Sequence, residues 1–274
     1  MGERACPLCG SARVAQLFVK HQTPYWRCTS CSFRFATPEV NPNLANAIDD
    51  YPAAYMQYLG PTPTDRANFD ALYAWMTSIA PFEGARLLDV GAGSGKLVRD
   101  LRRLGVDAQG IEPSPALFDR FLAGDDAFKH ATLEDVHGTF DAVTTFDVIE
   151  HVADPNRFAE AIAERLVPGG TWFLSTPDVE SLTARAFGRR WHFYYPYHLS
   201  YFGPRTLDRL AARHGFRRTH LTHPGRVRSI GYMVRYVAEY IGGGTAPPWA
   251  SRFDDWHLPT NLFDTMQVAL RRPA

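Results

Sequence analysis

The stretch RLLDVGAGSG, residues 86–95, decides the fold of this chain. Its apolar residues Leu87, Leu88 and Val90 do not alternate with polar ones, so they predict a short parallel strand buried on both faces. The three glycines that follow allow a sharp turn and let the backbone approach a ligand without Cβ clashes. The stretch therefore predicts a buried strand that ends in a ligand-facing turn.

A helix and a second strand follow this turn. From Lys96 to Gly105 apolar residues alternate with arginines at helical spacing, which predicts an amphipathic helix. Residues 106–111 then predict a strand that ends at the acid Glu112. In such units the turn amides face the ligand, and an acid at the end of the second strand accepts hydrogen bonds from ribose hydroxyls. The unit is therefore expected to bind a nucleoside.

The spacing excludes two common nucleotide-binding loops. A dinucleotide fingerprint needs a glycine where Lys96 stands. A phosphate-binding P-loop needs a glycine at the position of Val90 and Ser or Thr at that of Leu97. An ordinary glycine-rich turn of an α/β domain is the structural alternative. The remaining pattern is Asp89-x-Gly91-x-Gly93-x-Gly95, with Glu112 downstream.

This pattern resembles the first motif of class I S-adenosylmethionine-dependent methyltransferases. The resemblance implies that Asp89 and the loop amides hold the methionine end of S-adenosylmethionine and that Glu112 holds its ribose. It also implies that residues after the third strand face the adenine. Tyr55, on a proline-rich segment, belongs either to a lid over the cofactor or to a helix that packs against the main domain. The cofactor residues implied are Asp89, Gly91, Ala92, Gly93, Gly95, Glu112, Leu133, Glu134, Phe146 and Tyr55.

The β-α alternation continues along the chain and predicts an α/β fold with a doubly wound, seven-stranded, mostly parallel sheet. Strands are expected at residues 86–90, 106–111, 127–131, 140–146, 171–175, 216–221 and 265–270, the last antiparallel as in the family. Helices are expected at 69–79, 96–104, 114–122, 158–166, 206–214 and 231–241, and a loop around 242–248. The expected parts are a zinc ribbon (1–38), a linker or lid (39–65), and a methyltransferase domain (66–274) with a substrate-recognition insert at about 178–204.

All four cysteines lie in the first 31 residues, as two C-x-x-C pairs separated by 18 residues. This spacing is typical of a four-cysteine zinc site, because two pairs complete a tetrahedron around one metal ion. Four thiolates leave no open coordination position, so the zinc is expected to be structural. Disulfides are the alternative, and they are disfavoured because nothing marks the chain for secretion. The predicted ligands are Cys6, Cys9, Cys28 and Cys31.

The twelve residues from Trp191 to Phe202 include seven aromatic residues and two histidines. They form either core or the substrate-recognition element that the family inserts after the fifth strand. Part of the segment resembles zinc-binding sugar C-methyltransferases, which carry Tyr-x-Glu-His. Tyr195 and His198 match that motif, but Tyr197 replaces the acid.

Methyl transfer to an oxygen or carbon acceptor requires removal of a proton, and histidine suits that role at neutral pH. His198 is the predicted base, with Tyr195 orienting it or the acceptor, and His192 is the reserve. His151, which follows the fourth strand, either lines the acceptor site or supports the loop.

Composition restricts the partners. The 274 residues carry zero net charge, 45% of them are hydrophobic, and no apolar run reaches the ~18 residues of a membrane span. The N-terminus lacks a signal-peptide pattern, so the protein is expected in the cytoplasm without a membrane partner. The sequence indicates no oligomeric state.

The leading interpretation is a methyltransferase for oxygen or carbon of a small-molecule acceptor, such as a sugar nucleotide or a secondary metabolite. One alternative is an RNA methyltransferase that grips nucleic acid with its zinc ribbon. Zero net charge disfavours nucleic acid as a partner, whereas a local basic patch of arginines would favour it. The other alternative is a non-catalytic zinc-ribbon scaffold protein. The residues of the basic patch would be Arg185, Arg189, Arg190, Arg217 and Arg218.

Overall fold

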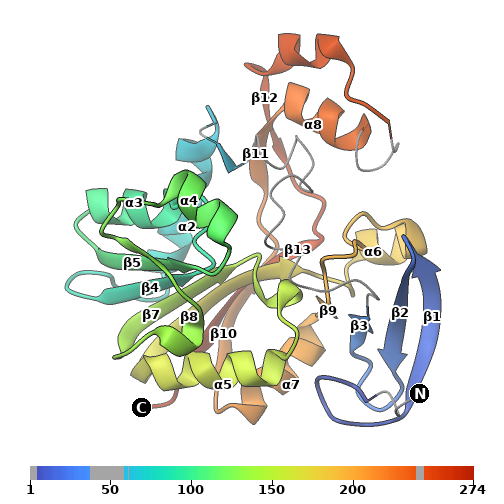
Figure 1. Cartoon of the computed structure of the whole chain (residues 1–274), viewed down its shortest axis with the longest axis horizontal. Helices are drawn as coiled ribbons and strands as arrows, with labels where there is room; N and C mark the ends of the chain where they lie inside the picture. Colours follow the sequence, from blue (N-terminus) through green and yellow to red (C-terminus); the bar gives the residue numbers. More distant parts are fainter. Residues whose placement is uncertain (1–4, 38–58, 61, 239–243) are drawn as a thin grey trace.

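A seven-stranded sheet forms the centre of the computed structural model, which describes residues 5–37, 59–60, 62–238 and 244–274 (Figure 1). The strand order is β10-β13-β8-β7-β4-β5-β6. Strands β4 to β8 run parallel, and β13 is antiparallel to both β8 and β10. This arrangement confirms the predicted mostly parallel sheet. Its strands are β4 (Arg86–Val90), β5 (Asp107–Glu112), β6 (Phe128–His130), β7 (Phe140–Phe146), β8 (Leu166–Pro177), β10 (Arg217–Thr222) and β13 (Thr265–Arg271).

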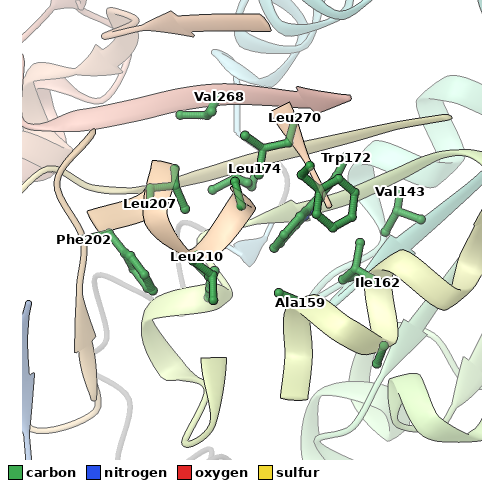
Figure 2. Packing of buried hydrophobic residues seen from close by; sticks show 14 of the residues in the cluster. Val143, Ala159, Ile162, Trp172, Leu174, Phe202, Leu207, Leu210, Val268 and Leu270 are labelled. Carbon is green, nitrogen blue, oxygen red and sulfur yellow. The ribbon is translucent and has the colours of Figure 1, made fainter. Parts of the chain in front are cut away.

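Helices cover both faces of this sheet. Neighbouring residues of β8 point to opposite faces, so Trp172 and Leu174 pack with α5 and α7 (Figure 2). Phe173 instead packs with α2 and α3. All three side chains are fully buried, which stabilises the fold by roughly 1.5–3 kcal/mol for each large apolar side chain. The helices are α2 (Asp65–Thr77), α3 (Lys96–Arg103), α4 (Pro115–Phe121), α5 (Pro155–Arg165) and α7 (Pro204–Arg213).

Strand β8 starts earlier than predicted. Leu166 was expected to end a helix, but it opens β8 and pairs with Phe140 of β7. The pairing then shifts register before Ala142 meets Thr171, and Gly169 in this stretch has φ +77°. The sequence Pro168-Gly169-Gly170, which is typical of a helix end, therefore forms an irregularity within strand β8.

The cysteine-containing segment forms an antiparallel sheet of β1 (Val14–Lys20), β2 (Thr23–Cys28) and β3 (Arg34–Ala36). A fourth strand, β9 (Ser200–Tyr201), comes from the aromatic insert and pairs with β3 (Figure 1). The sequence did not predict this pairing, because it joins residues more than 160 positions apart. The ribbon and the insert therefore share one sheet.

The ribbon also packs against the main domain. The rings of Phe33 and Phe202 lie 5.0 Å apart, and Phe33 belongs to the core cluster that contains Trp172. Asn156 Nδ2, on α5, donates to Pro7 O at 2.6 Å, and Arg213 Nη1, on α7, donates to Leu8 O at 2.9 Å. The ribbon is thus fixed to one end of α5 and α7.

The segment between β10 and β13 forms an arm that the sequence did not predict (Figure 1). Among the described residues, its strands β11 (Arg226–Ser229) and β12 (His257–Thr260) pair only with each other, and they lack the apolar run that would have revealed them. The predicted helix 231–241 corresponds to α8 (Ile230–Tyr236), and residues 239–241 of that prediction lie outside the described residues. The 3₁₀ helix η7 (Pro248–Phe253) follows where a loop was expected to end. No helix in the described part of the chain has the length and apolar character needed to span a bilayer.

Candidate functional site

Asp89 stands near the carboxyl end of β4 and is only 5% exposed. Its Oδ1 accepts a hydrogen bond from Thr144 Oγ1 at 2.6 Å, because Asp89 and Thr144 are paired across β4 and β7. Burial raises the pKa of Asp89 to about 7, and the nearby Glu112 carboxylate adds to that rise. Asp89 is therefore poised to change its charge near neutral pH. Thr144 was not identified from the sequence.

Glu112 fixes the glycine turn. Its Oε2 accepts a hydrogen bond from Gly93 N at 2.8 Å, and its Oε1 accepts one from Ser114 N at 2.9 Å. The carboxyl is 5% exposed, and burial raises its pKa while the two backbone bonds oppose that rise. The predicted acid thus lies beside the predicted loop and holds its backbone directly.

The loop leaves room for a ligand at Gly93. A Cβ there would approach only Leu59 Cδ2, at 3.8 Å, among the described atoms. A Cβ on Gly91 would instead lie 2.7 Å from Val148 Cγ2, and one on Gly95 would lie 2.6 Å from Phe128 Cζ. Gly91 and Gly95 are therefore required by packing, whereas Gly93 presents bare backbone. These features fit the methionine and ribose parts of S-adenosylmethionine.

Gly95→Ala is expected to destabilise the protein by about 2–4 kcal/mol, because it combines left-handed backbone strain with overpacking. Gly95 has φ +76°, and the added Cβ would press on Phe128 and Leu122. Gly105→Ala is the matched control, because φ is +83° but nothing lies within 4 Å of its Cβ position. Denaturant unfolding of both variants measures the difference. Equal destabilisation would contradict the packing role of Gly95.

The remaining predicted cofactor residues lie in different environments. Leu133, in the short 3₁₀ helix η3 (Leu133–Asp135), is buried in the same core cluster as Trp172, whereas Glu134 is exposed. Phe146 ends β7 and is partly buried, and Ala92 is partly buried beside the glycines. Tyr55 lies outside the described residues.

A second cluster forms beyond the end of β7. Glu150 and His151 lie in the 3₁₀ helix η4 (Ile149–His151), and His198 comes from the aromatic insert. One ligand-type atom from each of the three side chains lies within 4.8 Å of the others, and the two imidazole rings are 4.7 Å apart. Leu199 N donates to Glu150 O at 2.7 Å, which ties the insert to η4. We call these three residues the Glu-His-His cluster.

Backbone contacts orient both histidines. His151 Nδ1 lies 3.0 Å from Tyr197 O, and His198 Nδ1 lies 3.0 Å from Phe193 O. Because a carbonyl oxygen only accepts hydrogen bonds, we assign the proton to Nδ1 in each ring, which leaves Nε2 with its lone pair. Burial lowers the pKa of His198 far below its usual value, and the protein around the His151 ring also lowers its pKa, although the residue as a whole is exposed. Both shifts favour the neutral imidazole.

Glu150 is 2% exposed, and its Oε2 has no hydrogen-bond partner among the described residues. The Thr176 hydroxyl is near enough to favour the charged form of Glu150. Its position does not, however, meet the geometry of a hydrogen bond to the carboxylate. Burial raises the pKa of Glu150 well above its usual value, and repulsion by the Asp147 carboxylate raises it further. Sequence reasoning missed Glu150. Its position after a parallel strand, next to His151, was the available signal.

Asp147 lies close to the cluster but is already paired. Its Oδ1 accepts from Ser175 Oγ at 2.6 Å, and its Oδ2 lies 3.2 Å from Arg226 Nη2 of the arm. Burial alone would raise its pKa, but Arg226 and Ser175 hold that pKa below its usual value. Asp147 therefore adds a negative charge beside the cluster.

The other predicted residues of the insert flank the cluster. The ring of Tyr195 lies 6.2 Å from that of His198, so the structure brings the predicted pair together. His192, the reserve base, instead faces Asp264, because its Nε2 lies 3.7 Å from Asp264 Oδ2. Trp191, Tyr194 and Tyr201 pack with Tyr25 of the ribbon, so part of the aromatic insert is core.

The Glu-His-His cluster adjoins the glycine loop. Val148, two residues before Glu150, occupies the space into which a Gly91 side chain would project. Both features follow the carboxyl ends of parallel strands β4 and β7, where α/β sheets bind ligands.

The four cysteine sulfurs lie within 4.8 Å of one another. Cys6 Sγ and Cys31 Sγ are 3.6 Å apart, as are Cys9 Sγ and Cys28 Sγ. Those distances exceed the ~2.05 Å of a disulfide and match the ~3.8 Å edge of a tetrahedron with Zn–S bonds of ~2.3 Å. The donor set thus fits zinc.

Two curated relatives match part of the chain. A ubiquinone biosynthesis O-methyltransferase from Caulobacter vibrioides is 40% identical over 107 residues, which are 35% of this chain and 42% of that protein. One from Cereibacter sphaeroides is 35% identical over 122 residues, which are 40% of this chain and 49% of that protein. The chain therefore spans less than half the length of these relatives.

Solved structures share the fold. A magnesium protoporphyrin IX methyltransferase from Synechocystis PCC 6803, with bound S-adenosylhomocysteine, aligns over 84% of this chain and 97% of its own. The TM-score is 0.55 at 15% identity, which is a likeness of fold alone. A methyltransferase-domain family profile matches residues 65–221. Because that match covers more than half of the 274 residues, the chain belongs to the methyltransferase-domain family.

Proposed function

We propose that the protein methylates an oxygen of a small-molecule acceptor bound at the Glu-His-His cluster. The observation that carries this proposal is the position of the cluster against the glycine loop, through Val148 and Gly91. The O-methyltransferase relatives support oxygen as the acceptor atom. Tyr197, at the position of the acid in sugar C-methyltransferases, also favours oxygen over carbon.

Bound S-adenosylmethionine supplies an activated methyl group: the acceptor oxygen bonds to the methyl carbon while the carbon–sulfur bond breaks, and its electron pair stays on sulfur. The chain's task is to hold the two reactants in line, which is worth up to ~7–11 kcal/mol of barrier. We assign Asp89 to the methionine ammonium and Glu112, with the loop amides, to the ribose and the loop backbone. Tyr195 orients the acceptor.

The zinc ribbon is proposed as a structural support for the insert. Its docking on α5 and α7 and its shared strand with β9 support this role rather than RNA recognition. Arg218 of the suggested basic patch is also engaged, because its Nε lies 2.6 Å from Asp208 Oδ1. We place the protein in the cytoplasm, where thiols stay reduced. We also propose that the zinc ribbon ends at residue 38 and that the methyltransferase domain begins after residue 65.

His198→Ala is expected to lower methyl transfer by about 10²–10⁴-fold and to leave the affinity for S-adenosylhomocysteine unchanged, since His198 lies outside the glycine loop. The assay follows labelled methyl from S-adenosylmethionine into the small molecules of a host-cell extract. His220→Ala is the control, because His220 is exposed on β10 and its ring bonds, within the described part of the chain, only to the Thr219 hydroxyl. An equal loss of turnover and cofactor affinity would instead mark His198 as structural.

Affinity for S-adenosylhomocysteine is expected to depend on the charge of Asp89. Because the pKa of Asp89 is about 7, the carboxyl is mostly protonated below pH 7 and must lose a proton to pair with the ligand's ammonium group. The Kd should therefore rise as pH falls below 7, by up to about tenfold per pH unit. Titrations from pH 5.5 to 8 on the wild type and on Asp89→Asn measure this. Identical profiles would refute the assigned role of Asp89.

A further inference from the structure

We infer that Glu150, His151 and His198 bind one divalent transition-metal cation, and that this cation holds the acceptor oxygen. The inference rests on the proposed function, because it assigns the chemistry of the same acceptor site. It concerns a site separate from the cysteine ribbon, built from one carboxylate and two imidazoles.

The geometry of the cluster suits a cation. Its three ligand-type atoms lie within 4.8 Å of one another, and ligands at ~2.0–2.2 Å from a common ion are separated by roughly 3–4 Å. Small side-chain rotations therefore suffice to close the site. The backbone already holds the histidines, since each Nδ1 faces a carbonyl oxygen and Nε2 makes no hydrogen bond to the described residues. Such outer hydrogen bonds orient metal-binding histidines in proteins.

Glu150 gives an independent indication. A carboxyl oxygen that is fully buried and unpartnered is costly, and native structures rarely leave one without a functional reason. Neither imidazole lies in hydrogen-bonding geometry to this oxygen, so the neighbouring rings leave it unsatisfied. A cation between the three side chains would satisfy Glu150 and both lone pairs at once.

The donor set selects the class of metal. Imidazole ligands suit Zn²⁺, Fe²⁺ and Ni²⁺, and the carboxylate also suits Mn²⁺, whereas Mg²⁺ and Ca²⁺ prefer all-oxygen sites. Asp147 lies nearby, but Ser175 and Arg226 already hold its oxygens, so it contributes charge without being a ligand. Three protein ligands leave coordination positions open, as in catalytic sites.

An open position would bind the acceptor hydroxyl. The cation lowers the pKa of that hydroxyl, its proton passes to solvent water, and the resulting oxyanion forms the bond to the methyl carbon. His198 is then a metal ligand, and it need not act as the base that the sequence predicted. The acceptor class is a small molecule whose methylated hydroxyl can ligate a metal ion.

The test measures bound metal and does not depend on turnover. The protein, with zinc in its ribbon, is equilibrated with Mn²⁺, and total Zn and Mn per chain are measured by atomic spectrometry after removal of free ions. Mn²⁺ is the probe because soft thiolates disfavour it and the Glu-His-His cluster accepts it. The wild type should bind one cation more per chain than Glu150→Gln, His151→Ala and His198→Ala. His220→Ala should match the wild type.

Equal metal content in the wild type and all three cluster variants would overturn the inference. Binding of S-adenosylhomocysteine, measured in parallel, identifies the variants that fold. If Glu150→Gln and His198→Ala do not fold because they alter buried positions, His151→Ala still tests the site, since His151 is exposed. Methyl transfer without the extra cation would reject the metal and leave the proposed function intact. Binding of the extra cation without methyl transfer would support the metal site and reject the proposed function.

Discussion

Replacing Glu112 with alanine should raise the Kd for S-adenosylhomocysteine at least about 100-fold. The carboxylate accepts hydrogen bonds from Gly93 N, which is partly buried, and from Ser114 N, which is buried, so its loss removes the acceptor of both at about 1–3 kcal/mol each. The two losses together reach about 2.8 kcal/mol, and a free-energy loss of that size in the ligand-binding conformation of the loop lowers affinity about a hundredfold. Calorimetric titration gives the Kd.

Asp107→Ala is the matched control for Glu112. Asp107 opens the same strand β5, at the end away from the loop, and its side chain is 76% exposed. Its removal should leave the Kd unchanged. Glu112→Gln should fall between the two, because its amide oxygen can accept one of the two backbone bonds while its NH₂ group opposes the other. An affinity near that of the wild type in Glu112→Ala would remove Glu112 from the cofactor site.

Cys28→Ser should release the ribbon zinc and lower the melting temperature by at least roughly 6 °C. Structural zinc contributes about 10–16 kcal/mol in zinc-finger peptides, and losing even about 3 kcal/mol shifts Tm by several degrees at this chain length. Methyl transfer should fall as well, because β3 pairs with β9 and Ala36 N donates to Leu199 O, next to His198. Differential scanning calorimetry and zinc analysis measure the two effects.

Ser30→Ala provides the comparison for the ribbon. Ser30 lies between Cys28 and Cys31 and is exposed, and among the described residues its hydroxyl bonds to the Ser11 and Arg13 side chains. Its loss should leave both zinc content and Tm close to wild type. Affinity for S-adenosylhomocysteine should change little in Cys28→Ser, since the glycine loop is outside the ribbon. An unchanged Tm after zinc loss would show that the ribbon does not support the fold.

Local patterns in the sequence predicted the central sheet and the cysteine cluster. Strands such as β4 are short apolar runs, and the Gly91–Gly95 spacing and the two C-x-x-C pairs are contained within a few residues each. Asp89 and Glu112 were also found this way, because each ends or nearly ends a predicted strand. Each of these features is formed by residues close together in the sequence, so a local sequence pattern is enough to predict it.

Long-range contacts were the features that the sequence did not predict. Glu150 meets His198 only after the insert folds back on η4, and β9 meets β3 only after the ribbon docks. Strands β11 and β12 have few apolar residues and pair across about 30 positions, so neither predicts the other. Leu166 was assigned to a helix because its spacing fitted the face of α5, but pairing with Phe140 decides its state.

The most direct test of the methyltransferase assignment and of its acceptor is label transfer. Purified protein is incubated with methyl-labelled S-adenosylmethionine and a host-cell extract that is then separated into small-molecule, RNA and protein fractions. We predict label in the small-molecule fraction, attached to oxygen, and its loss in His198→Ala. Label confined to RNA would contradict the small-molecule acceptor, and absence of both label and cofactor binding would contradict the account of the site.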